Sequence, residues 1–303
     1  MSNKSNFKDT LKIDTLKKEY IPNRQEAASF YSEYTNSQKA QFIALLNFLC
    51  YKLEDFKSKC LLSERIEFTA RIKSPASALD NHLINSTKKT LNYNTANQEK
   101  TVNSNTETNS NQEQTNNSNT EDNSNSVKKL DDCFGITFLY SSPDEQPDLE
   151  NFISQMTIMT KKKLPKENGH NVIHTYNYVS KTTVTEIRKF LLKTKSIHPK
   201  DINQYNIDTF PLVEIQYKTF NQEYEDTRGK TAHWRYKGIN PQLIIKKYKN
   251  NEFIPGYNIP YMYEYDPKEH KVFLLDDVQT LMKEYPFIFN PSLLEDKDND
   301  YIH

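Results

Sequence analysis

PLVEIQYKTFNQEYEDTRGKTAHWRYK, residues 211–237, changes its hydrophobic period in the middle. The first part alternates polar residues with three apolar ones, Val213, Ile215 and Tyr217. A period of two is typical of a strand with one buried and one polar face. After Thr219 the spacing is helical, and Gly229 marks a break or a close approach. The helical spacing joins Phe220, Tyr224 and Trp234. The stretch therefore predicts a strand that leads directly into a helix.

The polar face of this predicted strand places Glu214 and Gln216 side by side. An edge strand with a solvated face explains that pattern without any function. A carboxylate and a carboxamide two residues apart, with a helix directly after them, also suit a binding or catalytic site. The spacing alone leaves both interpretations open.

Length, charge and cysteine usage bound the possible functions. The chain has 303 residues, room for one large domain or two small ones. Lys plus Arg and Asp plus Glu both total 40, so a net charge of zero gives no global argument for nucleic-acid or membrane binding. Cys50, Cys60 and Cys133 lack C-x-x-C spacing and predict neither a disulfide framework nor a zinc site. No apolar stretch reaches the length of a membrane span, so we expect a cytoplasmic protein with no membrane partner.

Composition divides the chain into three parts. Residues 1–22 are polar and predict a flexible N-terminus. Residues 23–240 carry the periodic segments and predict one domain, interrupted at 92–128 by a tract rich in Asn, Thr, Ser, Gln and Glu. Such a tract cannot bury enough apolar surface to offset its ordering entropy, so we expect a disordered insertion. Residues 241–303 form a C-terminal extension that could pack on the core, recognise a partner or regulate access.

Helical and strand patterns alternate along the chain. Helical spacing is found in residues 24–60, 77–83, from about 149 onwards, 183–194, and at both ends of the extension. Strand patterns are found in residues 64–73, 130–140, 171–179, 213–219 and 271–275. The alternation predicts an α/β (α+β) fold, a mixed β-sheet flanked by helices.

The amino-acid sequence of residues 211–237 also resembles that of a known family. V-E-I-Q-Y-K-T at Val213–Thr219 and A-H-W-R-Y-K at Ala232–Lys237 resemble the end of the synthetase domain of the RelA/SpoT family, which makes guanosine tetra- and pentaphosphate alarmones. The resemblance covers about residues 24–238. It implies a nucleotidyltransferase-like sheet and, because no H-D hydrolase motif lies upstream, a divergent synthetase-only member.

R-I-K-S-P-A-S at residues 71–77 resembles the R-x-K-S-P-x-S segment of that family. The resemblance implies that Arg71, Lys73 and Ser77 bind ATP. From the residues alone, two cations beside a helix start are either an anion site or a solvated basic pair.

Asp132, Gly135 and Thr137 resemble the family's D-x-x-G-I-R segment, with threonine in place of the arginine. The resemblance implies that Asp132 binds Mg²⁺, a hard cation that prefers carboxylate oxygens. Without the resemblance, capping of a turn by Asp131 and Asp132 is the favoured interpretation. The arginine helps hold ATP in the family, so its loss bears on donor affinity.

LPKENGHNVIHT, residues 164–175, resembles the acceptor loop P-K-x-N-x-Y-x-S-x-H-T. The resemblance implies that Lys166 binds ATP and that Asn168, His170 and His174 bind the acceptor. His170 replaces the tyrosine that stacks on guanine, and Val172 replaces the serine. Base stacking contributes about 1–3 kcal/mol, and an imidazole offers a smaller platform.

The resemblance as a whole implies a pyrophosphokinase that moves the β,γ-pyrophosphate of ATP to the ribose 3′-hydroxyl of GDP or GTP and releases AMP. Asp132 and Glu214 would be the catalytic residues and Mg²⁺ ligands, and Gln216 would position the acceptor with His174. Two alternatives stay open: a toxin-like enzyme acting on another 3′-hydroxyl such as that of tRNA, and an inactive homologue that binds nucleotides or a partner. A homo-oligomer is also left open.

Overall fold

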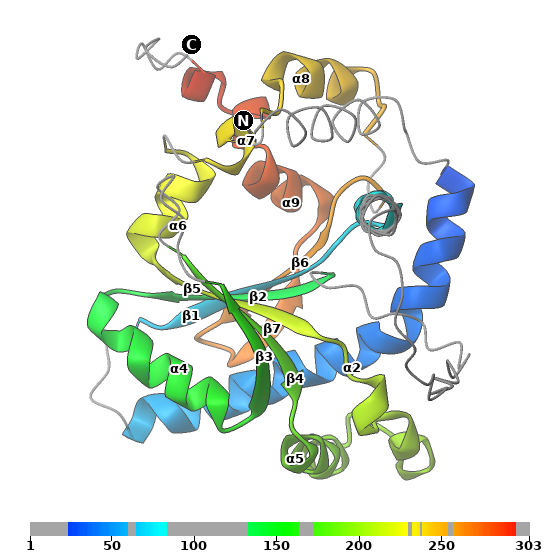
Figure 1. Ribbon diagram of the computed structural model, residues 1–303, viewed down its shortest axis with the longest axis vertical. Helices are drawn as coiled ribbons and strands as arrows, with labels where there is room; N and C mark the ends of the chain where they lie inside the picture. Colours follow the sequence, from blue (N-terminus) through cyan, green and yellow to red (C-terminus); the bar gives the residue numbers. More distant parts are fainter. Residues whose placement is uncertain are drawn as a thin grey trace, which may run out of the picture.

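The computed structural model describes residues 24–59, 65–83, 133–163, 172–229, 232–236, 238–253 and 257–294. The predicted flexible N-terminus and the predicted insertion lie outside these residues. The described strands form one seven-stranded sheet in the order β3-β4-β5-β2-β1-β6-β7 (Figure 1). They are β1 Glu67–Ile72, β2 Phe134–Tyr140, β3 Thr157–Lys163, β4 Ile173–Val179, β5 Val213–Thr219, β6 Tyr261–Asp266 and β7 Lys271–Leu274. Among these strands β2 and β5 pair in parallel, and every other neighbouring pair is antiparallel.

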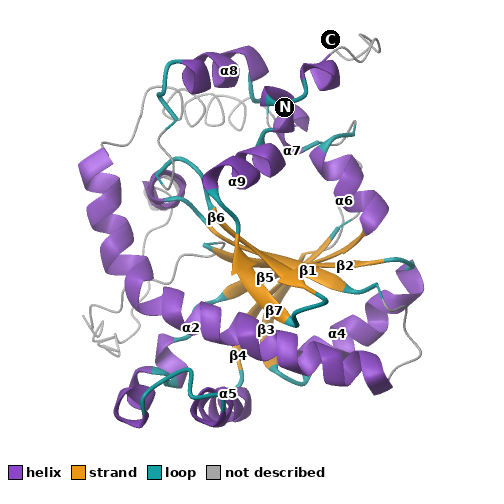
Figure 2. Cartoon of the chain, turned by 180° about the vertical axis from the view of Figure 1, so that it is seen from behind, coloured by secondary structure: helices purple, strands orange, loops and turns teal. Residues whose placement is uncertain are grey.

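Helices cover both faces of this sheet (Figures 1 and 2). On one face lie α2 Arg24–Lys59, α4 Gln146–Ser154 and α5 Lys181–Lys193. On the other lie α6 Phe220–Thr227 and α9 Asp277–Glu284, with α7 His233–Tyr236 and α8 Pro241–Lys249 beyond them. The short 3-10 helices are η1 Pro143–Glu145, η2 Pro199–Gln204, η3 Ile207–Thr209, η4 Pro286–Ile288 and η5 Pro291–Leu294. Residues 75–83 are also helical. The predicted mixed sheet flanked by helices is therefore confirmed.

The main core lies between the sheet and the long helix α2. Phe42, Leu46 and Leu53 of α2 are fully buried, as the helical spacing of its apolar residues predicts. The facing side of the sheet is apolar because alternate strand residues point the same way, among them Phe68, Ile136 and Ile215. Most apolar residues of β1, β2 and β5 therefore lie on this face, and the other face of these three strands carries mainly polar side chains.

The change of period at Thr219 has a local cause. The Thr219 hydroxyl accepts a hydrogen bond from the Gln222 backbone N–H, and the Gln222 side chain accepts one from the Thr219 N–H. This reciprocal cap starts α6 at once after β5. The helix then ends at Thr227, and a Cβ on Gly229 would lie 2.8 Å from Glu225 Cα, so only glycine fits there. A single helix reaching Trp234 is not formed, because α7 begins separately at His233.

Two further features differ from the sequence expectations. β3 was not predicted, because most of its residues are exposed on both faces and no apolar alternation marks it. The extension is built into the sheet: β6 pairs with β1, with Met262 opposite Arg71 and Glu264 opposite Thr69. Of the three roles left open for the extension, packing on the core is the one that its described residues, 241–253 and 257–294, show. No described helix combines the length and the apolar character needed to cross a membrane.

Candidate functional site

A row of four residues crosses the polar face of the sheet. Arg71 of β1 lies opposite Gly135 of β2, Gly135 opposite Glu214 of β5, and Glu214 opposite Tyr176 of β4. Residues directly opposite one another across paired strands share a face. The polar face predicted for β5 is therefore at the centre of the sheet. The interpretation of β5 as a solvated edge strand is wrong, because β4 and β2 flank it and Glu214 is only 5% exposed.

Glu214 is surrounded by hydrogen-bond donors. Its Oε1 accepts from the Tyr176 hydroxyl at 2.9 Å and lies 2.9 Å from Nδ1 of His174. Its Oε2 accepts from the Gln216 amide at 3.3 Å and lies 3.7 Å from Nη2 of Arg71. Burying a carboxylate is unfavourable unless it is paired and hydrogen-bonded, and these four side chains meet that requirement.

Gly135 makes the contact with Arg71 possible. Arg71 and Glu214 sit on strands separated by β2, so the Arg71 side chain must cross that strand. A Cβ at Gly135 would lie 3.4 Å from Nε and 3.5 Å from Cγ of Arg71. An alanine Cβ would therefore just touch the Arg71 side chain, and a larger side chain would extend into the path of Arg71.

These contacts keep Glu214 ionised. Burial alone would raise the pKa of Glu214. The hydrogen bond from His174, the charge of Arg71, the charge of His174 and the hydrogen bond from Tyr176 act the other way and hold the pKa well below its ordinary value. An ionised carboxylate only accepts hydrogen bonds, so Nδ1 of His174 must carry the proton in their contact. In neutral His174 this leaves Nε2 as the nitrogen with a free lone pair.

A second row on the same face lies one pleat away. It contains His174, Gln216, Thr137 and Thr69, each opposite the next across β4, β5, β2 and β1. Thr137, which stands where the resembled family has arginine, is thus next to Gln216. Farther along β5, Lys218 binds both Glu223 at 3.0 Å and Asp226 at 2.9 Å. Because Lys218 already pairs with two carboxylates, it stabilises α6 against β5.

The predicted site residues divide into three groups. Arg71, His174, Glu214 and Gln216 come together around the Glu214 carboxylate. Lys73 and Ser77 lie where β1 gives way to the helical residues 75–83, and the Lys73 backbone N–H donates to the carbonyl of Cys133 at 3.0 Å. The Ser77 side chain is exposed, and its backbone N–H donates to Ser74 Oγ at 3.3 Å. Asp132, Lys166, Asn168 and His170 lie outside the described residues.

Tyr176 is a site residue that the sequence interpretation missed. Its hydroxyl accepts from Nζ of Lys163 and donates to Glu214, so it links a cation on β3 to the buried carboxylate. The signal was available: Tyr176 follows His174 by two residues in a predicted strand, so the two share a face. Lys163 was not identified because β3 itself was not predicted.

The donor chemistry of the site is compatible with one Mg²⁺ ligand from Glu214. Mg²⁺ in phosphate-transfer sites is held by one or two carboxylates together with waters and substrate phosphates. Oε2 of Glu214 has only a long hydrogen bond and the Arg71 contact, and it is the oxygen with capacity left. Among the described residues no three His, Cys, Asp or Glu side chains gather into a metal cluster. The resemblance implies Asp132, which directly precedes Cys133 in the chain, as the second carboxylate.

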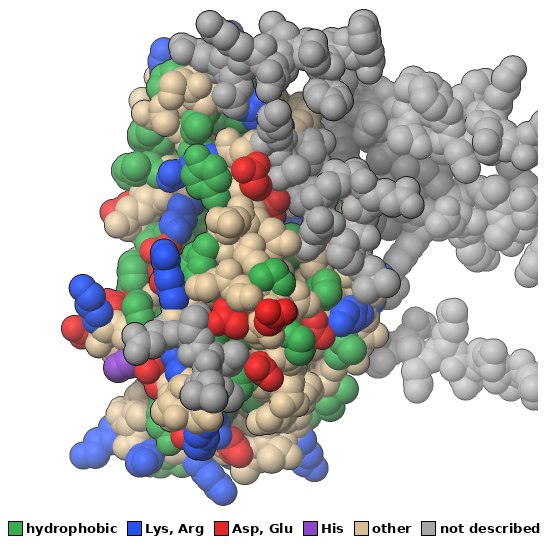
Figure 3. Space-filling view, turned by 90° about the vertical axis from the view of Figure 1, so that its left-hand side faces the viewer, with side chains coloured by type: hydrophobic (Ala, Val, Ile, Leu, Met, Phe, Trp, Pro, Cys, Tyr) green, Lys and Arg blue, Asp and Glu red, His purple; other side chains and the backbone are tan. Residues whose placement is uncertain are grey.

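Charge on the face drawn in Figure 3 is mixed. Basic and acidic side chains alternate across the middle of the face drawn in Figure 3. This distribution fits the zero net charge of the chain and gives that part of the face no large region of one sign.

In comparisons with known proteins, no protein-family model, no curated protein and no solved structure matches this chain. The RelA/SpoT resemblance therefore stays a prediction that rests on the motif residues.

Proposed function

We propose that the protein is a pyrophosphokinase of RelA/SpoT-like, nucleotidyltransferase-like fold that transfers the β,γ-pyrophosphate of ATP to the 3′-hydroxyl of GDP or GTP. The observation that carries the proposal is the ionised, buried Glu214 held between Arg71 on one side and His174 and Tyr176 on the other. Arg71 supplies a cation for phosphate oxygens, and His174 supplies a nitrogen that can take a proton. A cation and a proton acceptor joined through one fixed carboxylate suit an in-line phosphoryl-type transfer.

The residues have distinct roles in this reaction. The 3′-oxygen forms a bond to the β-phosphorus, the bond from that phosphorus to the α,β-bridging oxygen breaks, and AMP leaves with that oxygen. The proton of the 3′-hydroxyl passes to Nε2 of His174, whose ring Glu214 orients through Nδ1. Arg71 balances the phosphate charge, and Gln216 positions the acceptor. Mg²⁺, when bound by Glu214 and Asp132, supplies further neutralisation of phosphate charge. The low pKa of Glu214 makes it a poor base, so orientation is the better role for it.

The proposal is tested with γ-labelled ATP, Mg²⁺ and GDP, GTP or bulk tRNA offered in turn. We expect label to move to GDP or GTP, and Glu214→Gln to lower the rate at least about 100-fold. Glu186→Gln, which removes a surface carboxylate of α5, is the matched control and retains activity. Formation of neither AMP nor labelled acceptor by the wild-type protein would refute the proposal and leave the inactive homologue as the better interpretation.

His174→Asn tests the role of Nε2 as the proton acceptor separately from the contact between Nδ1 and Glu214. The asparagine amide retains a donor near Nδ1 but removes Nε2. We expect kcat to fall about 100- to 10,000-fold while the KM for ATP is unchanged. An unchanged kcat would exclude His174 as the base.

A second acceptor is favoured by one observation. Lys161, Lys162 and Lys163 are consecutive and exposed on β3, and Lys163 lies opposite His174. A basic edge beside the acceptor side of the site suits the phosphate backbone of an RNA. Label found on tRNA and on neither GDP nor GTP would establish this alternative.

A further inference from the structure

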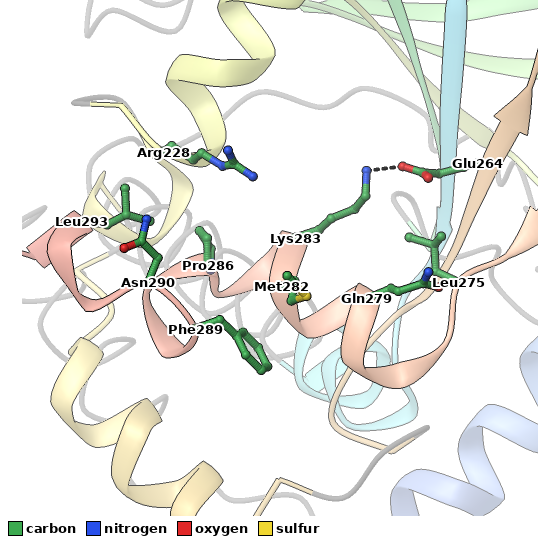
Figure 4. Close-up of a pocket in the computed structure, with 10 residues that line it drawn as sticks. All are labelled: Arg228, Glu264, Leu275, Gln279, Met282, Lys283, Pro286, Phe289, Asn290 and Leu293. Carbon is green, nitrogen blue, oxygen red and sulfur yellow. Dashed lines mark ion pairs between the residues drawn. The ribbon is translucent and has the colours of Figure 1, made fainter.

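A cavity of about 400 Å³ opens between the extension and the rest of the molecule (Figure 4). Arg228, which directly follows α6, and Glu264 of β6 line it. Met282 and Lys283 of α9 and Phe289, which directly follows η4, also line it. This volume lies within the range of small-molecule sites, which are about 300–1,000 Å³. The cavity is therefore large enough for a ligand the size of a nucleotide.

The lining combines cations with exposed apolar side chains. Lys283 forms an ion pair with Glu264. The Arg228 guanidinium extends toward α9, and no described residue forms an ion pair or side-chain hydrogen bond with it (Figure 4). Met282 is 49% exposed and Phe289 is 39% exposed. An unneutralised guanidinium, an exposed phenyl ring and a thioether that line one cavity suit a ligand that joins an anionic group to an aromatic ring.

The cavity lies on the same face of the sheet as the row of residues around Glu214. Glu264 lies opposite Thr69 on β1, and Arg71 is two residues from Thr69 on the same face. Neighbouring strands are about 4.8 Å apart, so β6 lies about 14 Å from β5, with β1 and β2 between them. Burial raises the pKa of Glu284 at the end of α9, whereas the positive charge of Arg71 lowers it and the negative charge of Glu223 raises it. The end of α9 therefore lies close enough to Arg71 for the two charges to interact. Arg71 therefore lies between the cavity and the Glu214 carboxylate.

We propose that this cavity holds the nucleoside monophosphate half of the donor, the AMP that leaves, so that the C-terminal extension is part of the substrate site. The identity of the donor rests on the proposed function. In this arrangement Arg228 binds the α-phosphate, Phe289 and Met282 contact the base, and Arg71 receives the adjoining pyrophosphate. An extended donor then runs from α9 across β1 to Glu214, which assigns to the extension a role in binding as well as in packing.

The test is calorimetric titration of AMP and, separately, of inorganic pyrophosphate into the full-length protein. Arg228→Gln is the main variant because Arg228 is exposed, so its loss leaves the fold intact. We expect it to weaken AMP binding about tenfold or more and to leave pyrophosphate binding unchanged, since the loss removes one charged hydrogen bond. Phe289→Ala is expected to act in the same direction. Lys246→Gln, an exposed lysine of α8 outside the cavity, is the matched control.

The outcomes separate this inference from the proposed function. AMP binding that is absent, or unchanged in Arg228→Gln and Phe289→Ala, overturns the assignment of the cavity even if transfer to GDP or GTP is observed. Equal weakening of AMP and pyrophosphate also overturns it, because the cavity would then be a general anion site. AMP binding that depends on Arg228 supports the assignment, and it does so even where transfer assays with every acceptor are negative.

Discussion

Arg71 and Glu214 belong to strands that are not neighbours, yet Nη2 of Arg71 lies 3.7 Å from Oε2 of Glu214. The glycine between them leaves the space that the guanidinium crosses.

Replacement of Gly135 tests that arrangement. The Cβ of Gly135→Ala fits in ordinary van der Waals contact with Arg71, whereas the Cγ atoms of Gly135→Val would overlap its side chain. We expect Gly135→Val to lower the transfer rate about 100-fold and Gly135→Ala to have little effect. Thermal unfolding should show a lower stability for Gly135→Val than for Gly135→Ala, because the overlap crowds a buried position and moves Arg71 away from the buried Glu214 carboxylate. Equal activity of the two variants would contradict the role of Gly135.

Removal of the Tyr176 hydroxyl tests the buried network. Tyr176→Phe deletes one donor to an ionised, buried carboxylate and leaves the ring in place. We expect the free energy of unfolding to fall by about 1–3 kcal/mol, measured by urea denaturation near neutral pH. Tyr224→Phe, at a tyrosine of α6 that is 58% exposed, is the control and should match the wild type. A Tyr176→Phe protein as stable as the control would show that the hydroxyl contributes nothing.

Lowering the pH should reduce the free energy of unfolding through Glu214. Its folded-state pKa lies below the unfolded-state value of about 4.3, so ionised Glu214 stabilises the fold at every pH above that value. The contribution is lost as the pH falls through the folded-state pKa. Urea denaturation between about pH 5 and pH 3 should therefore show a steeper fall in stability for the wild type than for Glu214→Gln. Parallel curves would mean that Glu214 is not held ionised.

Truncation after residue 240 tests whether the extension is needed by the sheet. It removes β6, whose pairing covers the outer edge of β1. An uncovered edge strand is a template for association with other chains, so we expect aggregation and no cooperative unfolding transition. Size-exclusion chromatography and circular dichroism measure this. A chain lacking only residues 295–303 keeps every described element and is the control. A monomeric, cooperatively folding fragment of residues 1–240 would contradict the expectation.

The sequence predicts those helices and strands whose apolar residues recur at regular spacing. The long helix over residues 24–60 and the strand at Val213 are found where they are predicted. Each buries one face, and a buried face requires apolar residues at regular spacing in the sequence. β3 has no buried face, so its sequence shows no alternation of apolar residues. Strand order is a matter of long-range pairing, so the position of β6 beside β1 cannot be read from local spacing.

The same distinction applies to the site. Arg71, His174, Glu214 and Gln216 are identified from their motifs, and the structure brings them together. The part played by Gly135 depends on a contact across three strands, which spacing along one strand does not reveal. Arg228 and Lys283 belong to no motif, and they line one cavity only because the fold brings the end of α6 near α9.

The pairing of β1 with β6 also sets the order in which the protein can assemble. Arg71 faces Met262, so the sheet cannot be completed while the chain is being synthesised until the late segment has emerged. Pairings between distant segments close large loops before they gain any contact, which slows folding. One edge of β1 therefore stays uncovered until residues 261–266 have emerged, and an uncovered strand edge exposes the nascent chain to association with other chains.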